Sequence, residues 1–280
     1  MTTRRQRGDL RLRKATLGPL ATATAALLTL AACGGGGGGG GNGGGGGGGG
    51  NPGPTNNAPT VSTDSLLLTS AGDSVTLTAT GSDPDGDPLT YTWAQSRGAD
   101  VDSASGADSS AYSFNAPAEV DTLTFTISVS DGSLSASSSV QLIVLEDENE
   151  AVFVDGAYSG GGSDGSLDAP FTSLRSAIES GSVTADYYIK TLPNSESYDI
   201  TGTSPFDELE LESNSLYGGY DDNWLRDVAT NRTLIVAGIR ALDFSNFDQP
   251  VTVSGLDITG GEIDTNTSKK NASGPIRAAR

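Results

Sequence analysis

The chain has 280 residues and a formal charge of −19, with 35 acidic and 16 basic residues. It contains no histidine and one cysteine, which excludes an intrachain disulfide, a thiolate zinc site and every site that requires imidazole. Six of the basic residues lie within the first fourteen positions, so residues 33–280 carry 34 acids and 10 bases. Because so acidic a surface repels phosphate backbones, we expect no nucleic-acid partner.

The chain begins with a basic segment and an apolar run, "ATLGPLATATAALLTLAA", that ends in small residues. The run is short and stops at glycine, which is typical of a signal peptide (residues 1–32) rather than a spanning helix. Leu30-Ala31-Ala32-Cys33 resembles the lipobox of bacterial lipoproteins. The resemblance implies cleavage before Cys33 and acylation of that cysteine, which would anchor the protein to a membrane. Gly34 after the cysteine implies an outer-membrane or cell-surface location. The alternative is an ordinary secretory signal with an incidental cysteine.

Residues 33–57 are rich in glycine, which occupies sixteen of the seventeen positions after Cys33. Such chains behave as flexible coils and build no core, so we expect a tether of roughly 25–30 Å. A phosphate loop is excluded because no Lys-Ser or Lys-Thr pair directly follows the glycines.

Residues 58–145 contain runs in which apolar side chains alternate with Thr and Ser, a pattern that predicts half-buried antiparallel strands. The runs are "SVTLTATG" (residues 74–81), "LTYTWA" (89–94), "LTFTISVS" (123–130) and "VQLIV" (140–144). Several such strands within about 90 residues favour a sandwich, with Trp93 filling its core. The stretches "TATGSDPDGDPLTYTW" and "FNAPAEVDTLTFTISVSDG" resemble the polycystic-kidney-disease (PKD) type of immunoglobulin-like domain. That family implies a spacer or adhesion module, rarely a catalyst.

One turn of this region has metal-binding chemistry. In "SDPDGDP", Asp83, Asp85 and Asp87 alternate, and Gly86 permits a sharp turn, so their carboxylates offer the oxygen ligands that calcium prefers. Calcium is the one cofactor that the sequence suggests. The EF-hand pattern is incomplete, however, and Asp-Pro and Asp-Gly pairs are ordinary turn formers, so a plain acidic turn is the alternative.

An acidic linker at residues 146–150 separates the sandwich from a second unit, residues 151–262. This unit starts with a short strand, "AVFVDG", and a glycine-rich loop that leads into a helix. Leu174, Ala177 and Ile178 have helical spacing, Thr172 or Ser173 can cap the start, and Gly181 can close the end. Short β-like pieces follow: "YYIK", "LELES", "SLYGGY", "TLIVAG", "ALDF" and "VTVSGLDITGG".

The stretches "VFVDG", "GSDGSLDAPFTSLRSAIESG" and "VTVSGLDITGG" resemble the start of a right-handed parallel β-helix of the pectin-lyase-like fold. In that family the helix caps the open end of the solenoid. The expected fold class is therefore all-β, an immunoglobulin-like β-sandwich followed by a short right-handed parallel β-helix with an N-terminal capping helix. Some members of the family are polysaccharide lyases or hydrolases, and many are adhesins.

No catalytic residue carries over from the β-helix enzymes. The sequence does not place Asp243, Asp248 and Asp257 on one face, and Arg240 stays protonated, so it suits an anion clamp better than a base. The alternative for these residues is a solvent-facing position on a repeat.

The motif "SLYGGYDDNW" suggests a sugar site. Tyr217, Tyr220 and Trp224 could stack on a sugar ring, with Asp221 and Asp222 accepting its hydroxyl protons. The alternative is that these aromatic residues pack a long loop.

Residues 263–280 form a polar tail that is basic, because no acid occurs after Asp264. We expect this tail to be disordered. Only some 80 residues separate the expected helix from this tail, enough for about three rungs. Two explanations stay open: a frameshift or premature end of a longer β-helix, and a genuine short β-helix.

The sequence therefore predicts a membrane-anchored cell-surface lipoprotein that binds glycan or protein ligands without catalysing a reaction. Its expected partners are the membrane, through the lipid on Cys33, and a glycan or a cell-surface protein. One alternative is a carbohydrate-active β-helix enzyme, a lyase or hydrolase, whose catalytic rungs are truncated or unrecognised. Another is a purely structural spacer.

Overall fold

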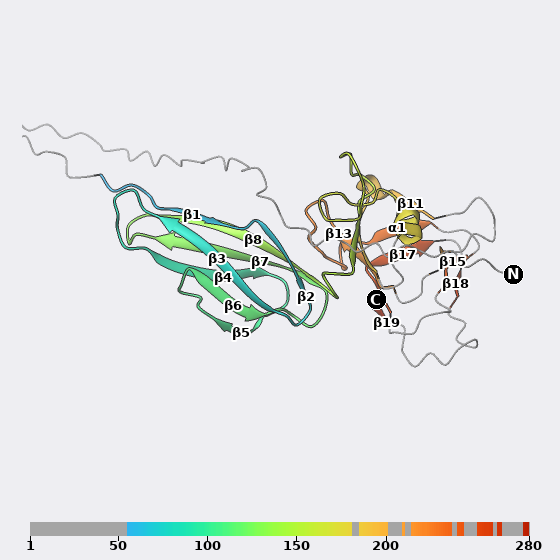
Figure 1. Cartoon of the computed structure of the whole chain (residues 1–280), viewed down its shortest axis with the longest axis horizontal. Helices are drawn as coiled ribbons and strands as arrows, with labels where there is room; N and C mark the ends of the chain where they lie inside the picture. Colours follow the sequence, from blue (N-terminus) through green and yellow to red (C-terminus); the bar gives the residue numbers. More distant parts are fainter. Residues whose placement is uncertain are drawn as a thin grey trace, which may run out of the picture. The chain divides into compact units, whose positions relative to one another are not determined.

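The structure is a computed structural model that describes residues 55–180, 185–200, 209–210, 214–236, 240–243, 251–259, 262–264 and 277–279. The expected signal peptide, the lipidation residue Cys33 and nearly all of the glycine-rich segment lie outside these residues. The described chain is mainly β, with an antiparallel immunoglobulin-like sandwich followed by parallel sheets and one short α-helix (Figure 1). None of the described helices has the length and apolar character needed to cross a membrane.

The sandwich consists of two four-stranded sheets, drawn in blue to green in Figure 1. One sheet has the order β1-β3-β6-β5 and the other β2-β8-β7-β4. All neighbouring strands are antiparallel except β2 and β8, which are parallel. The strands are β1 (Thr60–Thr63), β2 (Leu66–Ser70), β3 (Ser74–Ser82), β4 (Thr90–Arg97), β5 (Asp102–Ser105), β6 (Ala111–Asn115), β7 (Asp121–Ser130) and β8 (Ser135–Leu145).

The alternation in the sequence sets which side chains face the core of the sandwich. Successive residues of a strand point to opposite faces, so every second side chain is buried. The predicted inward rows of β3, β7 and β8 are buried: Val75, Leu77, Ala79, Leu123, Phe125, Ile127, Val129, Val140, Leu142 and Val144. Trp93 is buried as predicted, and its indole Nε1 donates to the carbonyl of Ser109 at 3.0 Å.

Three parallel sheets follow the sandwich, and all their strand pairs are parallel. The first has the order β19-β16-β13-β10-β9, the second β11-β14-β17 and the third β12-β15-β18. From β10 onward the described strands visit the first, second and third sheet in turn, and this order recurs. The strands are β9 (Ala151–Val154), β10 (Asp186–Lys190), β11 (Ser197–Asp199), β12 (Leu209–Glu210), β13 (Leu216–Tyr220), β14 (Thr233–Val236), β15 (Arg240–Asp243), β16 (Thr252–Ser254), β17 (Leu256–Thr259), β18 (Glu262–Asp264) and β19 (Arg277–Ala279).

The predicted helix is present as α1 (Leu174–Ser180), and the Oγ of Ser173 accepts from the N–H of Ser176 at 3.3 Å as its cap. Its three predicted apolar residues are buried in a core with one face of the first parallel sheet. A single 3₁₀ turn, Pro193–Ser195, precedes β11. Gly181, the expected helix end, lies outside the described residues.

The two faces of the first parallel sheet belong to different cores. Val152 and Val154 of β9, with Tyr187 and Ile189 of β10, pack on the side of α1. The residues that alternate with these in the sequence, Phe153 and Tyr188, point to the opposite face of the sheet. They belong to a second cluster that also contains residues of the sandwich. β9, β10 and β13 are buried at every position, so both faces of this part of the sheet are covered.

Candidate functional site

The predicted calcium ligands lie in the turn between β3 and β4. Asp83 Oδ1 accepts from the backbone N–H groups of Asp85 at 2.8 Å and Asp87 at 3.2 Å. The carboxylate of Asp85 accepts from the backbone N–H and side-chain amide of Asn57 at 2.6 and 3.0 Å. Across the described residues, no three His, Cys, Asp or Glu side chains group closely enough to hold a metal ion. These contacts are those of an acidic turn, and calcium binding here stays a prediction.

The aromatic residues suggested for sugar stacking are interior residues. Tyr217, Tyr220 and Trp224 are 3%, 0% and 7% exposed, so their rings are turned away from solvent. Tyr217 stacks on Tyr188 with ring centroids 5.2 Å apart, and Trp224 meets Tyr220 edge-on at 5.8 Å. Stacking on a glycan would require this cluster to open. The arrangement is that of the alternative in which the aromatic residues pack the core.

The loop after β13 is held by a tight turn at Asp221. Its Oδ1 accepts from the backbone N–H groups of Asn223 and Leu225, each at 2.8 Å, and its backbone carbonyl accepts from the N–H of Trp224 at 3.0 Å. Trp224 has a φ of 60°, which is unfavourable for a bulky L-residue. The turn bonds thus fix a strained backbone that directs the indole inward. Asp221, proposed as a sugar acceptor, is already engaged in this turn.

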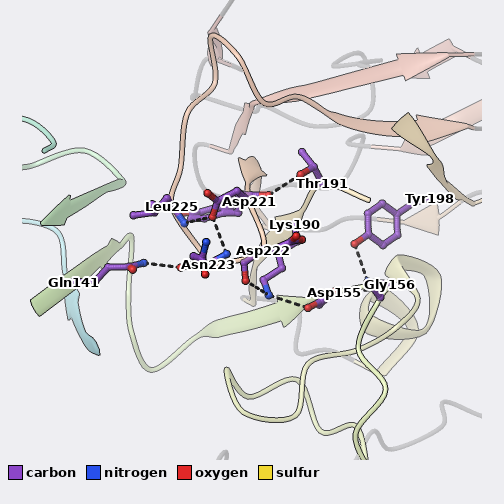
Figure 2. Close-up of polar contacts among 12 residues, drawn as sticks. Gln141, Asp155, Gly156, Lys190, Thr191, Tyr198, Asp221, Asp222, Asn223 and Leu225 are labelled. Carbon is purple, nitrogen blue, oxygen red and sulfur yellow. Dashed lines mark hydrogen bonds and ion pairs between the residues drawn. The ribbon is translucent and has the colours of Figure 1, made fainter. Parts of the chain in front are cut away.

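A buried lysine that the sequence did not single out lies beside this loop. Lys190, at the end of β10, donates from Nζ to Asp155 Oδ2 at 2.9 Å and to the backbone carbonyl of Asp222 at 3.0 Å (Figure 2). The side chains of Lys190 and Asp155 are only 10% and 14% exposed. The ammonium also lies 4.5 Å from the ring centroid of Trp224. In the sequence, the only sign of this pair is that a lysine stands at the end of an apolar strand.

Asp186 is a second buried charge that the sequence did not reveal. It is 6% exposed at the start of β10 and accepts from the backbone N–H of Ser215 at 2.8 Å. Burial raises the pKa of Asp186 to about 6, and the carboxylates of Glu146 and Glu150 add to the rise, while the bonds from Ser215 oppose it. Part of this carboxyl is therefore protonated near neutral pH.

Of the polar residues considered for β-helix catalysis, Asp257 belongs to the second parallel sheet, and Arg240 and Asp243 belong to the third. Asp257 of β17 pairs with Arg232, whose Nε lies 2.5 Å from its Oδ1. Arg240 and Asp243 lie on β15, where Asp243 is in register with Asp264 of β18. Asp248 lies outside the described residues.

The outward face of β4, β7 and β8 carries rows of small polar side chains in register. The strand pairing aligns them three across: Thr90, Ser130 and Ser135; Thr92, Ser128 and Ser137; Ala94, Thr126 and Ser139. All nine positions are exposed or half-buried, and none is charged. Neighbouring strands lie about 4.8 Å apart and alternate residues about 6.7 Å apart. Eight of the nine positions therefore form a regularly spaced array of hydroxyl groups, which is interrupted at Ala94.

Residues 63–144 match the family model described as "K319L-like, PKD domain", which is less than half of the chain. A comparison with curated proteins finds no match. Among solved structures, a nucleoside hydrolase-related hypothetical protein from Saccharophagus degradans, associated with carbohydrate metabolism, is 28% identical over 32% of this chain and 26% of its own, with a TM-score of 0.29.

Two further structures are similar at lower identity. The endo-fucoidan hydrolase MfFcnA4, of glycoside hydrolase family 107, is 23% identical over 36% of this chain and 16% of its own, with a TM-score of 0.25. Human protocadherin-24 EC1-2 is 20% identical over 39% of this chain and 57% of its own, also with a TM-score of 0.25. The chain thus spans about a quarter of the Saccharophagus protein and less of the fucoidan hydrolase. The family match and the sandwich together identify residues 63–144 as a PKD-type immunoglobulin-like domain.

Proposed function

We propose that the chain is a membrane-anchored surface protein that binds a neutral glycan through the outward face of β4, β7 and β8. The observation that carries the proposal is the array of uncharged hydroxyl groups on this face, in a chain whose formal charge is −19. Hydroxyl groups both donate and accept hydrogen bonds, as sugar hydroxyls do. An uncharged face also avoids the cost of desolvating carboxylates on binding.

Glycan arrays and calorimetry with the mature chain test this function. We expect saturable binding to a neutral polysaccharide without turnover. Ser128→Glu places a charge in the centre of the face and should weaken binding at least tenfold. Thr78→Glu on β3, in the other sheet of the sandwich, is the matched control and should leave binding unchanged. An absence of saturable binding, or an equal loss in both variants, contradicts the proposal.

The membrane anchor in this proposal is supported by the sequence Leu30-Ala31-Ala32-Cys33 alone. The intact mass of the native protein, extracted from membranes with detergent, tests it. We expect the mass of Cys33–Arg280 plus diacylglyceryl and acyl groups. A mass without acyl groups excludes the anchor, and a mass well above the expected one means that the protein continues beyond Arg280.

We further propose that the parallel sheets form a short right-handed β-helix. The recurring visits to three parallel sheets support this, because each circuit would be one rung. In a background with Cys33→Ser, the register pair Val236→Cys and Thr259→Cys should form a disulfide on oxidation. The offset pair Val236→Cys and Ile258→Cys should not, because adjacent residues point to opposite faces. Equal cross-linking of both pairs argues against this register.

One observation favours the enzymatic alternative. Asp243 and Asp264 are in register on neighbouring parallel strands, and glycoside hydrolases use two carboxyl groups that flank the scissile bond. If this pair is catalytic, the chain hydrolyses a polysaccharide, and Asp243→Asn and Asp264→Asn each abolish turnover. Reducing-sugar release from a panel of polysaccharides tests this, and its absence in the unmodified chain excludes catalysis by this pair.

A further inference from the structure

The outer face of the first parallel sheet carries an aromatic ladder, beside the buried charges of Asp186 and Lys190. Tyr188 is in register with Phe153 on one neighbouring strand and with Tyr217 on the other. The ring centroids lie 5.6 and 5.2 Å apart along this ladder. Tyr220 and Trp224 extend it, and all five residues are at most 7% exposed. Without a cover, these rings would form an apolar patch of a kind that soluble monomers rarely expose.

Residues of the PKD-type domain supply that cover. Val120, Ile143 and Leu145, which are 8%, 0% and 0% exposed, belong to the same buried cluster as the aromatic ladder. Leu66 and Leu68 of β2 pack against it from the edge of the sandwich. The side chains of Ile143 and Leu145 therefore face away from the sandwich's own core, in which Leu142 and Val144 lie.

The loop at residues 221–226, which we name the clasp, adds polar bonds to the sandwich. Arg226 donates from Nη1 to the carbonyl of Val120 at 3.2 Å and from Nε to the carbonyl of Gly218 at 3.1 Å, so one guanidinium joins both parts. The sandwich contributes three further donors to backbone carbonyls of the clasp: Thr122 Oγ1 to Trp224 at 3.2 Å, Gln141 Nε2 to Asn223 at 2.9 Å and Arg97 Nη2 to Arg226 at 2.9 Å.

Glu146, which lies between the sandwich and the parallel sheets in the sequence, is hydrogen-bonded to the aromatic ladder. The backbone N–H of Glu146 donates to the hydroxyl of Tyr188 at 2.8 Å, and its carboxylate accepts from the hydroxyl of Tyr217 at 2.9 Å. The expected linker at residues 146–150 is thus bonded to the ladder that the sandwich covers.

We propose that the PKD-type domain is a permanent cover for the aromatic ladder, locked by the clasp, so that the sandwich and the parallel sheets move and unfold as one body. An interface with a continuous apolar core and paired polar groups opposes relative motion of its two sides. The strained backbone of Trp224 agrees with this role, because such strain persists only where the surroundings compensate for it. This role goes beyond ligand binding, because it requires no ligand.

Calorimetry of the mature chain tests the proposal through a clasp variant, Trp224→Ala with Arg226→Ala. We expect one unfolding transition for the unmodified protein and two, separated by at least about 5 °C, for the clasp variant. The control is Asp222→Asn, whose exposed side chain can change while its backbone carbonyl still accepts from Lys190. Two transitions in the unmodified protein, or one transition in the clasp variant, overturn the proposal.

A second pair of measurements does not depend on whether the clasp variant folds. Nuclear relaxation of the unmodified chain should give one rotational correlation time for amides of the sandwich and of the parallel sheets, whereas separate times contradict the proposal. Arg97→Ala with Gln141→Ala removes two sandwich donors and leaves the aromatic ladder intact. It should speed hydrogen exchange of the clasp amides relative to the control Thr92→Ser, and equal exchange rates in the two would count against the clasp.

Discussion

Lys190 and Asp155 form an ion pair that is almost fully buried. Lys190→Met removes the cation and leaves the buried carboxylate of Asp155 without its charge partner. The free energy of unfolding should fall by about 3–5 kcal/mol, because an uncompensated buried charge is costly. Urea denaturation at pH 7 measures the change.

A double variant and an exposed ion pair serve as the controls for Lys190→Met. Asp155→Asn combined with Lys190→Met should cost less than Lys190→Met alone, because no buried charge remains. Glu179→Ala removes an exposed i,i+4 pair with Arg175 and should cost less than about 1 kcal/mol. A loss for Lys190→Met as small as that for Glu179→Ala would show that the pair is solvated.

The hydroxyl groups of two neighbouring tyrosines differ in their bonding. In the described residues, the hydroxyl of Tyr220 is buried without a hydrogen-bond partner, whereas that of Tyr188 accepts from Glu146. Tyr220→Phe should leave the free energy of unfolding unchanged or raise it by about 1 kcal/mol, because it removes an unpaired polar group. Tyr188→Phe should lower it by about 1–2 kcal/mol. Thermal denaturation measures the stability of both variants. A larger loss of stability for Tyr220→Phe than for Tyr188→Phe would contradict the assigned bonding of the two hydroxyl groups.

The titration of Asp186 makes stability depend on pH. Its folded-state pKa of about 6 lies above the ordinary value of 3.8, so the folded protein binds this proton more tightly than the unfolded chain. Its contribution is therefore greatest below about pH 4 and is lost as pH rises through 6, a change of about 3 kcal/mol. Asp186→Asn should be more stable than the unmodified chain at pH 7.5 and no more stable at pH 4. Urea denaturation at several pH values measures this difference, and a constant difference between the two proteins refutes the shift.

At the scale of elements, two glycines allow the strands of the parallel sheets to approach closely. A Cβ on Gly218 of β13 would lie 2.5 Å from the carbonyl oxygen of Gly255, and a Cβ on Gly255, at φ 72°, would overlap the carbonyl oxygen of Gly218. Gly255→Ala should therefore lower the free energy of unfolding by at least about 2–3 kcal/mol, through clash as well as backbone strain.

The control for this prediction is a glycine with the same strain and open space. Gly132, in the turn between β7 and β8, has a φ of 96° and no atom within 4 Å of an added Cβ. Gly132→Ala should cost about 1 kcal/mol, from backbone strain alone. Thermal denaturation compares the stability of the two variants. Equal losses of stability would mean that the backbone between β16 and β17 can shift to accommodate the added Cβ.

At the scale of the whole molecule, the excess of acids should weaken the folded state. The chain has 35 acidic and 16 basic residues, and mutual repulsion of like charges opposes compactness. Raising NaCl from 10 to 200 mM should raise the melting temperature by about 2–5 °C, because the Debye length shortens. A neutral osmolyte at equal osmolarity is the control. A fall in melting temperature with NaCl would mean that attractive ion pairs dominate.

The sequence alone was enough for features that depend on local periodicity. Alternation with period 2 predicted the buried rows of β3, β7 and β8, and helical spacing predicted the buried face of α1. The PKD-type domain was also recognisable, because its turns and strands follow one another in a continuous stretch. The short strands β1, β2 and β5 were missed because their side chains show no regular apolar–polar alternation. β6 was also missed, although Tyr112 and Phe114 alternate with polar residues there, because the alternating stretch is only four residues long.

The tertiary structure decided what the aromatic residues of residues 217–224 do. In the sequence, a tyrosine beside Gly-Gly and a tryptophan beside Asp-Asn are equally compatible with an exposed sugar site and with a buried core. They are buried by tertiary contacts, among them those with Ile143 and Leu145, which lie more than 70 positions earlier in the chain. The same holds for Lys190 and Asp186, whose charges are partnered or desolvated by groups far away in the chain. Local periodicity determines which face of a strand is apolar, but not what covers that face, because the cover is provided by another part of the chain.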